Sequence, residues 1–276
     1  MPNSRILALL VCCIAAMPLC AQQAPVPPPA PSPNAPLFRQ VGEQYRVYEF
    51  PGTGEPIPYR LYVPESWKPG QHLPLLVTLR AGFSINNNHR EGNDLVQEAR
   101  KHGYLVVSPL GYRGLAQPYY GSPYPVDRPA GPSKPAEGWS KEENERAEQD
   151  VLNVISIVSD EYGVDSKKIY LHGQNPSGSA AFHFAAKYPE RFKAIVVSSG
   201  PIITSGYPFE KLKDRVAVLL VHGDKDSSNP VSASERMRDA LVQHGIETQL
   251  HIIPGGEHLN AYLKDAPAIF DFLDKH

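Results

Sequence analysis

The residues with the clearest chemical pattern lie in one stretch of the chain, residues 168–189. β-forming residues at 169–171 precede Gly173, and helix-forming residues follow at 177–188, so the stretch predicts a strand, a sharp turn and a helix. Such a turn lifts one residue to the edge of the sheet, beside a helix N-terminus that favours negative charge. This is the geometry of the nucleophile elbow, Gly-x-Ser-x-Gly, whose serine attacks a carbonyl carbon.

The residues around this turn resemble those of the α/β-hydrolase family, in particular secreted esterases similar to polyhydroxybutyrate depolymerases and feruloyl esterases. In those esterases a strand ending in Gly-x-Ser-Met-Gly-Gly leads to a helix ending in Ala-Lys-Tyr-Pro-x-x-Phe. Here the turn reads Gly-Gln-Asn-Pro-Ser-Gly and the helix ends in Ala-Lys-Tyr-Pro. The resemblance extends from about residue 45 to the C-terminus, and it implies an α/β-hydrolase fold that acts on carboxylic esters.

The position of the nucleophile departs from the family pattern. Aligned without gaps, Gly173 takes the first glycine and Asn175 takes the serine. A carboxamide offers no oxygen that a base can convert into an attacking nucleophile, although asparagine tolerates the left-handed backbone of the turn. Pro176, which follows, has no backbone N–H, and that N–H is one of the oxyanion donors of the resembled fold. Pro176 instead suits the first position of the following helix.

The second oxyanion loop is also altered. In the resembled family His-Gly follows the strand predicted at 73–79, whereas this chain has Arg80 and Ala81 there. Arg80 is interpreted either as a fixed cation for a carboxylate or sulfate, or as a surface arginine paired with a nearby acid. Three departures in one site with an intact frame are the pattern expected of an active site that is no longer used.

Two alternative nucleophiles remain open. Ser177 stands where the family has a glycine, and its side chain is expected to pack against the strand or to cap the helix. The other alternative is hydrolysis of Asn175 to aspartate, which is the nucleophile of haloalkane dehalogenases. Pro176 argues against this route, because it is not the flexible following residue that eases deamidation.

The resemblance also implies an acid and a histidine, which follow the nucleophile in that order. Asp226 lies just past a predicted buried strand, in a His-Gly-x-x-Asp pattern similar to the acid position, with Asp224 as the competing acid. His258 follows Pro-Gly-Gly-Glu, after the last predicted strand, and matches the histidine. We therefore expect Asn175, Asp226 and His258 to converge at the C-terminal edge of the central sheet.

The rest of the chain alternates between two periodicities. Residues expected to form strands are 45–50, 57–63, 73–79, 104–108, 169–171, 194–198, 216–221 and 248–253. Residues expected to form helices are 93–102, 144–162, 177–188, 232–244 and 259–276. This alternation predicts an α/β fold with a mostly parallel sheet covered by helices on both faces.

Residues 111–139 form a Pro-rich stretch without periodicity that follows the C-terminal end of a predicted strand, where open α/β sheets bind ligands. Its aromatic residues are Tyr112, Tyr119, Tyr120, Tyr124 and Trp139. They are interpreted either as an aromatic wall or lid for a sugar or aryl group, or as part of a surface loop whose tyrosines pack inward.

The N-terminal segment predicts export. Arg5 precedes an apolar run at 6–17, which indicates a signal peptide over 1–21, with a membrane anchor as the alternative. Residues 22–37 are rich in proline and alanine and predict an extended linker, so residues 38–276 are expected to form the folded domain. The protein is expected to be secreted or periplasmic, with lipidation of Cys20 as a further alternative.

Composition limits the remaining function classes. The 276 residues carry a net charge of −2 and no basic run, which gives no reason to expect a nucleic-acid partner. All three cysteines lie at positions 12, 13 and 20, so the mature domain is expected to have no disulfide and no Cys-ligated metal. No cofactor and no membrane span are expected.

Three hypotheses follow from these patterns. The first is a secreted esterase-like protein that has lost hydrolysis and binds a carbohydrate or ester ligand in the old cleft. The second is an active carboxylic-ester hydrolase with Ser177 as a non-standard nucleophile. The third is a non-enzymatic interaction module on the cell exterior, tethered by the Pro-rich linker.

Overall fold

The computed structural model describes residues 39–79, 95–109, 111–112, 120–127 and 138–276. The predicted signal peptide, linker and first domain residue lie outside these ranges, as do Arg80, Ala81 and Tyr119. In the described part of the chain, no helix is long and apolar enough to cross a membrane.

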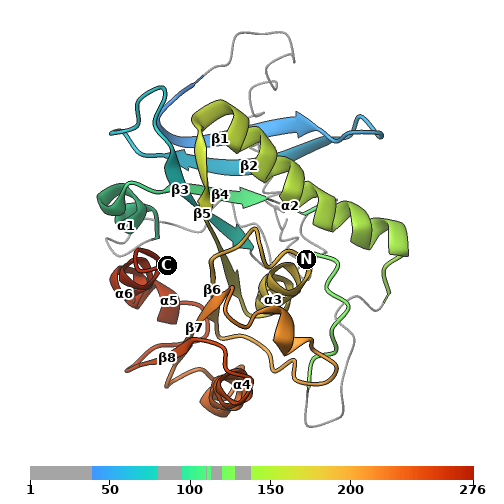
Figure 1. Ribbon diagram of the computed structural model, residues 1–276, viewed down its shortest axis with the longest axis vertical. Coiled ribbons are helices and arrows are strands. Elements are labelled where there is room, and N and C mark those ends of the chain that lie inside the picture. The colour runs from blue at the N-terminus through green and yellow to red at the C-terminus, as the bar shows by residue number, and fades with distance from the viewer. Residues whose placement is uncertain (1–38, 80–94, 110, 113–119, 128–137) are drawn as a thin grey trace, which may run out of the picture.

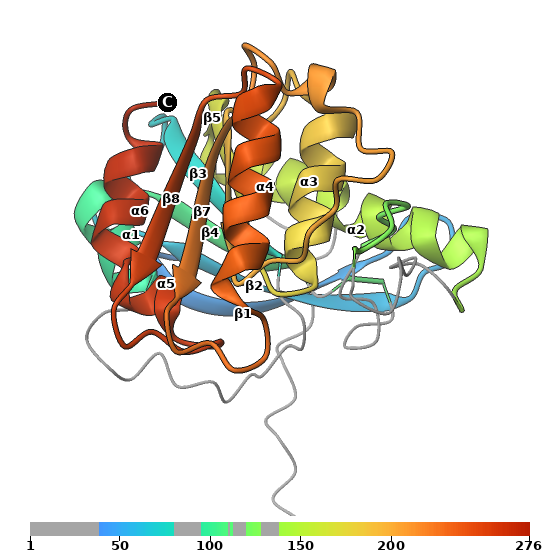
Figure 2. The same cartoon turned by 90° about the horizontal axis from the view of Figure 1, so that it is seen from below.

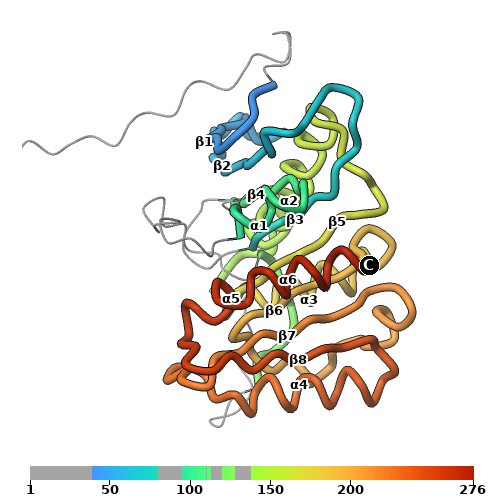
Figure 3. Tube along the Cα trace, turned by 90° about the vertical axis from the view of Figure 1, so that its left-hand side faces the viewer, coloured from blue at the N-terminus to red at the C-terminus, as the bar shows by residue number. Residues whose placement is uncertain are grey.

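Eight strands form one sheet in the order β1-β2-β4-β3-β5-β6-β7-β8, with β1 and β8 at opposite edges (Figures 1 and 3). The strands are β1 (Gly42–Glu49), β2 (Pro56–Val63), β3 (Leu73–Leu79), β4 (Leu105–Pro109), β5 (Val164–Gln174), β6 (Ala194–Ser198), β7 (Ala217–Gly223) and β8 (Thr248–Ile253). β3 to β8 run parallel, whereas β2 pairs antiparallel with both β1 and β4. The predicted mostly parallel sheet is confirmed.

Helices cover both faces of this sheet (Figure 2). They are α1 (Leu95–His102), α2 (Lys141–Tyr162), α3 (Ser177–Lys187), α4 (Val231–Gln243), α5 (Ala261–Lys264) and α6 (Ala266–Leu273), with a 3₁₀ turn, η2, at Phe209–Lys211. Side chains of α2, α3 and α4 join one core cluster, and those of α1, α5 and α6 join the other. Because apolar layers lie on both sides, every residue of β6 and β7 is buried.

Several elements differ from their predicted bounds by a few residues, and three of these differences bear on the local structure. α2 begins three residues earlier than expected, because Ser140 and Glu143 form a capping box at its N-terminus. β5 is longer than its β-forming core and extends to Gln174, directly before the turn. The single helix expected at 259–276 is wrong: the segment forms α5 and α6, since Pro267 lacks the N–H that a continuous helix needs.

Candidate active site

The turn between β5 and α3 has the geometry of a nucleophile elbow. Asn175 lies between the last residue of β5 and Pro176, and it adopts the left-handed conformation with φ of 53°. Its backbone N–H donates to Ser198 O on β6 at 2.8 Å, and its carbonyl accepts from Gly178 N at 3.0 Å. Asparagine is among the residues that tolerate this conformation, so the turn keeps its shape without serine.

Two glycines allow the elbow to be this tight. A Cβ added to Gly173 would lie 2.3 Å from the backbone oxygen of Ser177, and one added to Gly178 would lie 2.6 Å from Val197 Cγ1. Strand, turn and helix therefore approach each other more closely than any side chain would permit. This packing leaves Ser177 fully buried, at 0% exposure, which places the alternative nucleophile inside the contact between strand and helix.

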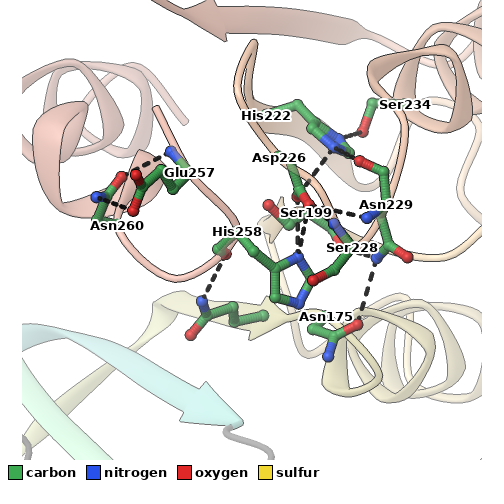
Figure 4. A network of polar contacts seen from close by, with 11 residues as sticks. Asn175, Ser199, His222, Asp226, Ser228, Asn229, Ser234, Glu257, His258 and Asn260 are labelled. Carbon is green, nitrogen blue, oxygen red and sulfur yellow. Dashed lines mark hydrogen bonds and ion pairs between the residues drawn. The ribbon is translucent and has the colours of Figure 1, made fainter. Parts of the chain in front are cut away.

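The predicted acid and histidine lie in contact. His258 Nδ1 is 2.9 Å from Asp226 Oδ2 and 3.1 Å from Asp226 Oδ1. The Asp226 side chain is fully buried, whereas His258 remains 15% exposed. In Figure 4 the imidazole ring lies between Asp226 and Asn175. The structure thus brings the three predicted residues together at the C-terminal edge of β5 and β7.

Hydrogen-bond donors surround the Asp226 carboxylate. The backbone N–H groups of Ser228 and Asn229 donate to Oδ1 at 2.9 and 2.8 Å, and His222 Nε2 lies 3.2 Å from Oδ2. Burial raises the pKa of Asp226, but the hydrogen bonds from Asn229 and His258 outweigh it and hold the pKa below its usual range. Asp226 is therefore ionised at neutral pH and can orient His258 through Nδ1.

The loop carrying Asp226 and the loop carrying His258 meet at two glycines. A Cβ on Gly223 would lie 2.1 Å from Gly256 O, so the two backbones touch directly. Lys225 N donates to Gly256 O at 2.8 Å, and Gly255 N donates to Asp224 Oδ1 at 2.7 Å. Asp224, the competing acid, therefore fastens the histidine loop, and Asp226 is the carboxylate that contacts His258.

Asn229 is a site residue that the sequence patterns did not indicate. Its side-chain nitrogen donates to Ser199 O at 2.8 Å and to Asn175 Oδ1 at 3.3 Å. It thus connects the acid loop to the elbow, 54 residues away in the chain (Figure 4). No motif marks this position, and only the converging loop ends beyond β6 and β7 could have suggested it.

The residue expected from the sequence to supply one oxyanion donor is a proline. Pro176 directly precedes α3 with φ of −61°, and it has no backbone N–H to offer. Arg80 and Ala81, predicted to form the other half of the oxyanion region, lie outside the described residues.

The aromatic residues predicted to line a ligand do not act as one group. Tyr112 and Tyr120 are 1% exposed, and their hydroxyls contact Arg146 Nη1 and Pro109 O, so both belong to the core rather than to a ligand wall. These two tyrosines pack inward, as the second of the two interpretations expected. Tyr124 is half-buried against Tyr207, at 4.9 Å between ring centroids, and Trp139 is half-buried just before α2.

A comparison with protein-family models agrees with this geometry. Residues 51–263, most of the chain, match the esterase family described as "Putative esterase". The chain belongs to this esterase family. The resemblance to α/β-hydrolase esterases noted in the sequence is thereby confirmed.

Known esterases are similar to this chain in sequence or in structure. A poly(3-hydroxyoctanoate) depolymerase from Pseudomonas fluorescens is 27% identical over 198 residues, which are 64% of this chain and 62% of the depolymerase. A bifunctional acetylxylan esterase/xylanase from Neocallimastix patriciarum is 24% identical over 63% of this chain and 22% of its own length. The crystal structure of a thermostable esterase matches with a TM-score of 0.61 and 22% identity, covering 84% of this chain and 62% of that one. The chain thus spans about three fifths of the depolymerase, and the structural match shows the fold.

Proposed function

We propose that this chain is an exported esterase-like protein that binds a carbohydrate or ester ligand over its former catalytic site and does not hydrolyse it. The observation that carries the proposal is the pair Asn175 and Pro176 at an otherwise well-formed elbow. The backbone geometry, the acid and the histidine are present, while a carboxamide occupies the position of the nucleophile. The site can therefore bind a ligand without hydrolysing it.

Two chemical deficits support the loss of hydrolysis. With no hydroxyl at Asn175, His258 has no proton to remove, so covalent catalysis has no first step. Pro176 removes one oxyanion donor, and losing one such donor costs about 2.7–4 kcal/mol of transition-state stabilisation. A water molecule attacking in place of serine would meet the same incomplete oxyanion site.

The burial of Ser177 argues against the active alternative. A nucleophilic hydroxyl must reach both His258 and the substrate carbonyl, whereas Ser177 is 0% exposed beneath the elbow. Exposing it would require separating α3 from β5 at the contact where Gly173 already touches the Ser177 backbone. Ser177 is therefore assigned a packing role.

The relatives indicate which ligands to test. One is named for a polymer of hydroxy acids and another for acetylated xylan, so oligomers of 3-hydroxyalkanoates and acetylated xylo-oligosaccharides are the first candidates. The exposed edge of His258 and the partly exposed Asn175 would contact the acyl group of either.

Isothermal titration calorimetry of the mature chain with both oligomer series tests the proposal, with mass spectrometry of the recovered ligand. We expect binding of at least one series and recovery of the ligand with its ester bonds intact. Binding should weaken in His258→Ala and stay unchanged in Arg238→Ala, a surface residue of α4. Turnover that depends on His258, or no binding to either series, would contradict the proposal.

A further inference from the structure

The orientation of the Asn229 amide is fixed by the backbone. The side-chain atom of Asn229 that lies 2.8 Å from Ser199 O must be the nitrogen, because a carbonyl oxygen can only accept a hydrogen bond. The Asn229 backbone N–H is itself committed to Asp226 Oδ1 at 2.8 Å, which holds the residue in place. Asn229 therefore presents an N–H₂ group to the elbow.

This orientation determines that of Asn175. The same Asn229 nitrogen lies 3.3 Å from the Asn175 side chain, so the Asn175 atom facing it is the acceptor, Oδ1. Asn175 Nδ2, which carries two hydrogens, consequently points away from Asn229 (Figure 4). Within the described part of the chain no group accepts a hydrogen bond from this nitrogen, and Asn175 is partly exposed.

His258 adds a second donor at the same place. Its Nδ1 donates to the Asp226 carboxylate, so the other ring nitrogen, Nε2, is on the side of Asn175 (Figure 4). The Asp226 carboxylate is fully buried and already accepts hydrogen bonds from the backbone N–H groups of Ser228 and Asn229, with His222 Nε2 3.2 Å from Oδ2. The exposed side of the site therefore offers an amide N–H and an imidazole nitrogen.

Asp226 is the acid that contacts His258 among the described residues. Asp226 bonds to Nδ1, and His222 lies on the far side of Asp226. Glu257, the preceding residue, accepts from Asn260 Nδ2 at 3.5 Å and lies away from the imidazole (Figure 4). No other described acid or base forms a hydrogen bond or ion pair with His258.

We infer that Asn175 and His258 form a carboxylate subsite within the proposed ligand cleft, which prefers a free carboxylate, such as the terminal group of a hydroxyalkanoate oligomer, over an ester group. One carboxylate oxygen accepts from Asn175 Nδ2 and the other from His258 Nε2, which donates when the ring is an imidazolium. Charge-assisted hydrogen bonds are about twice as strong as neutral ones, and an ester carbonyl offers only a neutral acceptor. This inference rests on the proposed loss of hydrolysis at the same site.

Calorimetric titration of the mature chain with butyrate, methyl butyrate and butyramide at constant ionic strength tests it. We expect butyrate to bind at least tenfold more tightly than either neutral probe.

Variants test the assigned donors. Asn175→Asp preserves size but replaces the N–H₂ group with an acceptor, and it should weaken butyrate binding at least tenfold. Asn229→Val frees the Asn175 amide to rotate and should weaken binding by a smaller factor. Asn153→Asp makes the same chemical change on α2, far from the elbow, and should bind butyrate like the wild type.

The outcomes separate this inference from the proposed function. Equal affinity for butyrate and methyl butyrate, no butyrate binding, or unchanged binding in Asn175→Asp would overturn the carboxylate site. Recovery of intact methyl butyrate from the same samples would leave the proposed loss of hydrolysis standing in each of those cases. Hydrolysis of methyl butyrate that depends on His258 would instead overturn the proposed function.

Discussion

The proposed loss of hydrolysis rests on two adjacent residues. Asn175 keeps the left-handed backbone of the elbow, with φ of 53°, but supplies a carboxamide where catalysis needs a hydroxyl. Pro176 keeps the start of α3, with φ of −61°, but supplies no N–H for a developing oxyanion. Each residue preserves the fold of the turn, and in the proposed function each removes one part of the reaction.

Repair of the site should be strongly non-additive. Asn175→Ser alone should recover little activity, because the new serine still faces the donorless Pro176. The double variant Asn175→Ser/Pro176→Met returns both the hydroxyl and the N–H, which act on one transition state, so it should exceed the single variant by roughly 10²-fold. The measurement is kcat/KM on a short-chain aryl ester for both single variants and the double variant.

Equal activity in Asn175→Ser and the double variant would show that Pro176 does not limit catalysis. The altered residues Arg80 and Ala81 should keep recovery partial. If every variant were inactive, Arg80 and Ala81 would be the remaining cause of the lost catalysis.

The contact between the acid and the histidine was predictable from the sequence, whereas the hydrogen bond that joins the acid loop to the elbow was not. Asp226 and His258 follow strands in recognisable glycine-rich turns, and the structure places them in contact. Asn229 is joined to Asn175 across 54 residues by one amide hydrogen bond, and local sequence carries no signal for such a contact. For Tyr112 and Tyr120 the sequence left two interpretations open, since a Pro-rich composition does not reveal which aromatic rings pack into the core.

At the scale of elements, the elbow depends on close contact between β5 and α3. Gly173→Ala would place a methyl group 2.3 Å from the Ser177 backbone oxygen, which cannot move without shifting α3. We expect this variant to lose about 3 kcal/mol or more of unfolding free energy, measured by urea denaturation.

Gly54→Ala is the matched control for this change. Gly54 has φ of +69° with nothing within 4 Å of an added Cβ, so its substitution strains the backbone without a clash. Its loss should be roughly 1–2 kcal/mol. Equal losses in the two variants would mean that the elbow relaxes more easily than the contact suggests.

Helix α2 carries a buried acid whose charge is unfavourable. Asp150 is fully buried, accepts from Tyr48 OH at 2.6 Å and Gly111 N at 2.8 Å, and burial raises its pKa to about 6. A raised acid pKa means that the native state binds the extra proton, so this contribution to stability is present below about pH 4 and is lost as pH rises through 6. The unfolding free energy of Asp150→Asn relative to that of the wild type should therefore rise by roughly 1–3 kcal/mol between pH 4 and pH 7.

Urea denaturation at pH 4, 5, 6 and 7 checks this prediction. The stability difference between Asp150→Asn and the wild type should grow between pH 4 and 6 and then level off. A difference that is constant with pH would contradict it.

Glu148, on the same helix, should behave in the opposite way. Burial raises its pKa, but hydrogen bonds from His183, Lys187 and Tyr188 outweigh that effect and lower it to about 2. Its contribution is present above about pH 4.5 and is lost as pH falls toward 2. Glu148→Gln should lose on the order of 2–3 kcal/mol at pH 7 and almost nothing near pH 2, by the same denaturation series.

At the scale of the whole molecule, periodicity was enough to predict the sheet and its two helical layers. Continuous apolar runs such as β6 and β7 indicate strands buried on both faces, and the structure buries every residue of both. Element ends were less predictable, because they depend on single hydrogen bonds such as the Ser140 capping box or on the N–H missing from Pro267. The candidate site lies at the C-terminal ends of the strands whose presence the sequence predicted.

The protein is proposed to bind a ligand at its former catalytic site without hydrolysing it. The most direct test of this proposal is the rate of short-chain aryl ester hydrolysis by the purified mature chain, compared with His258→Ala. We expect both proteins to show the same background rate, because His258 has no nucleophile to activate. Robust turnover in the wild type that His258→Ala abolishes would contradict the account, and its loss in Ser177→Ala as well would identify Ser177 as the nucleophile.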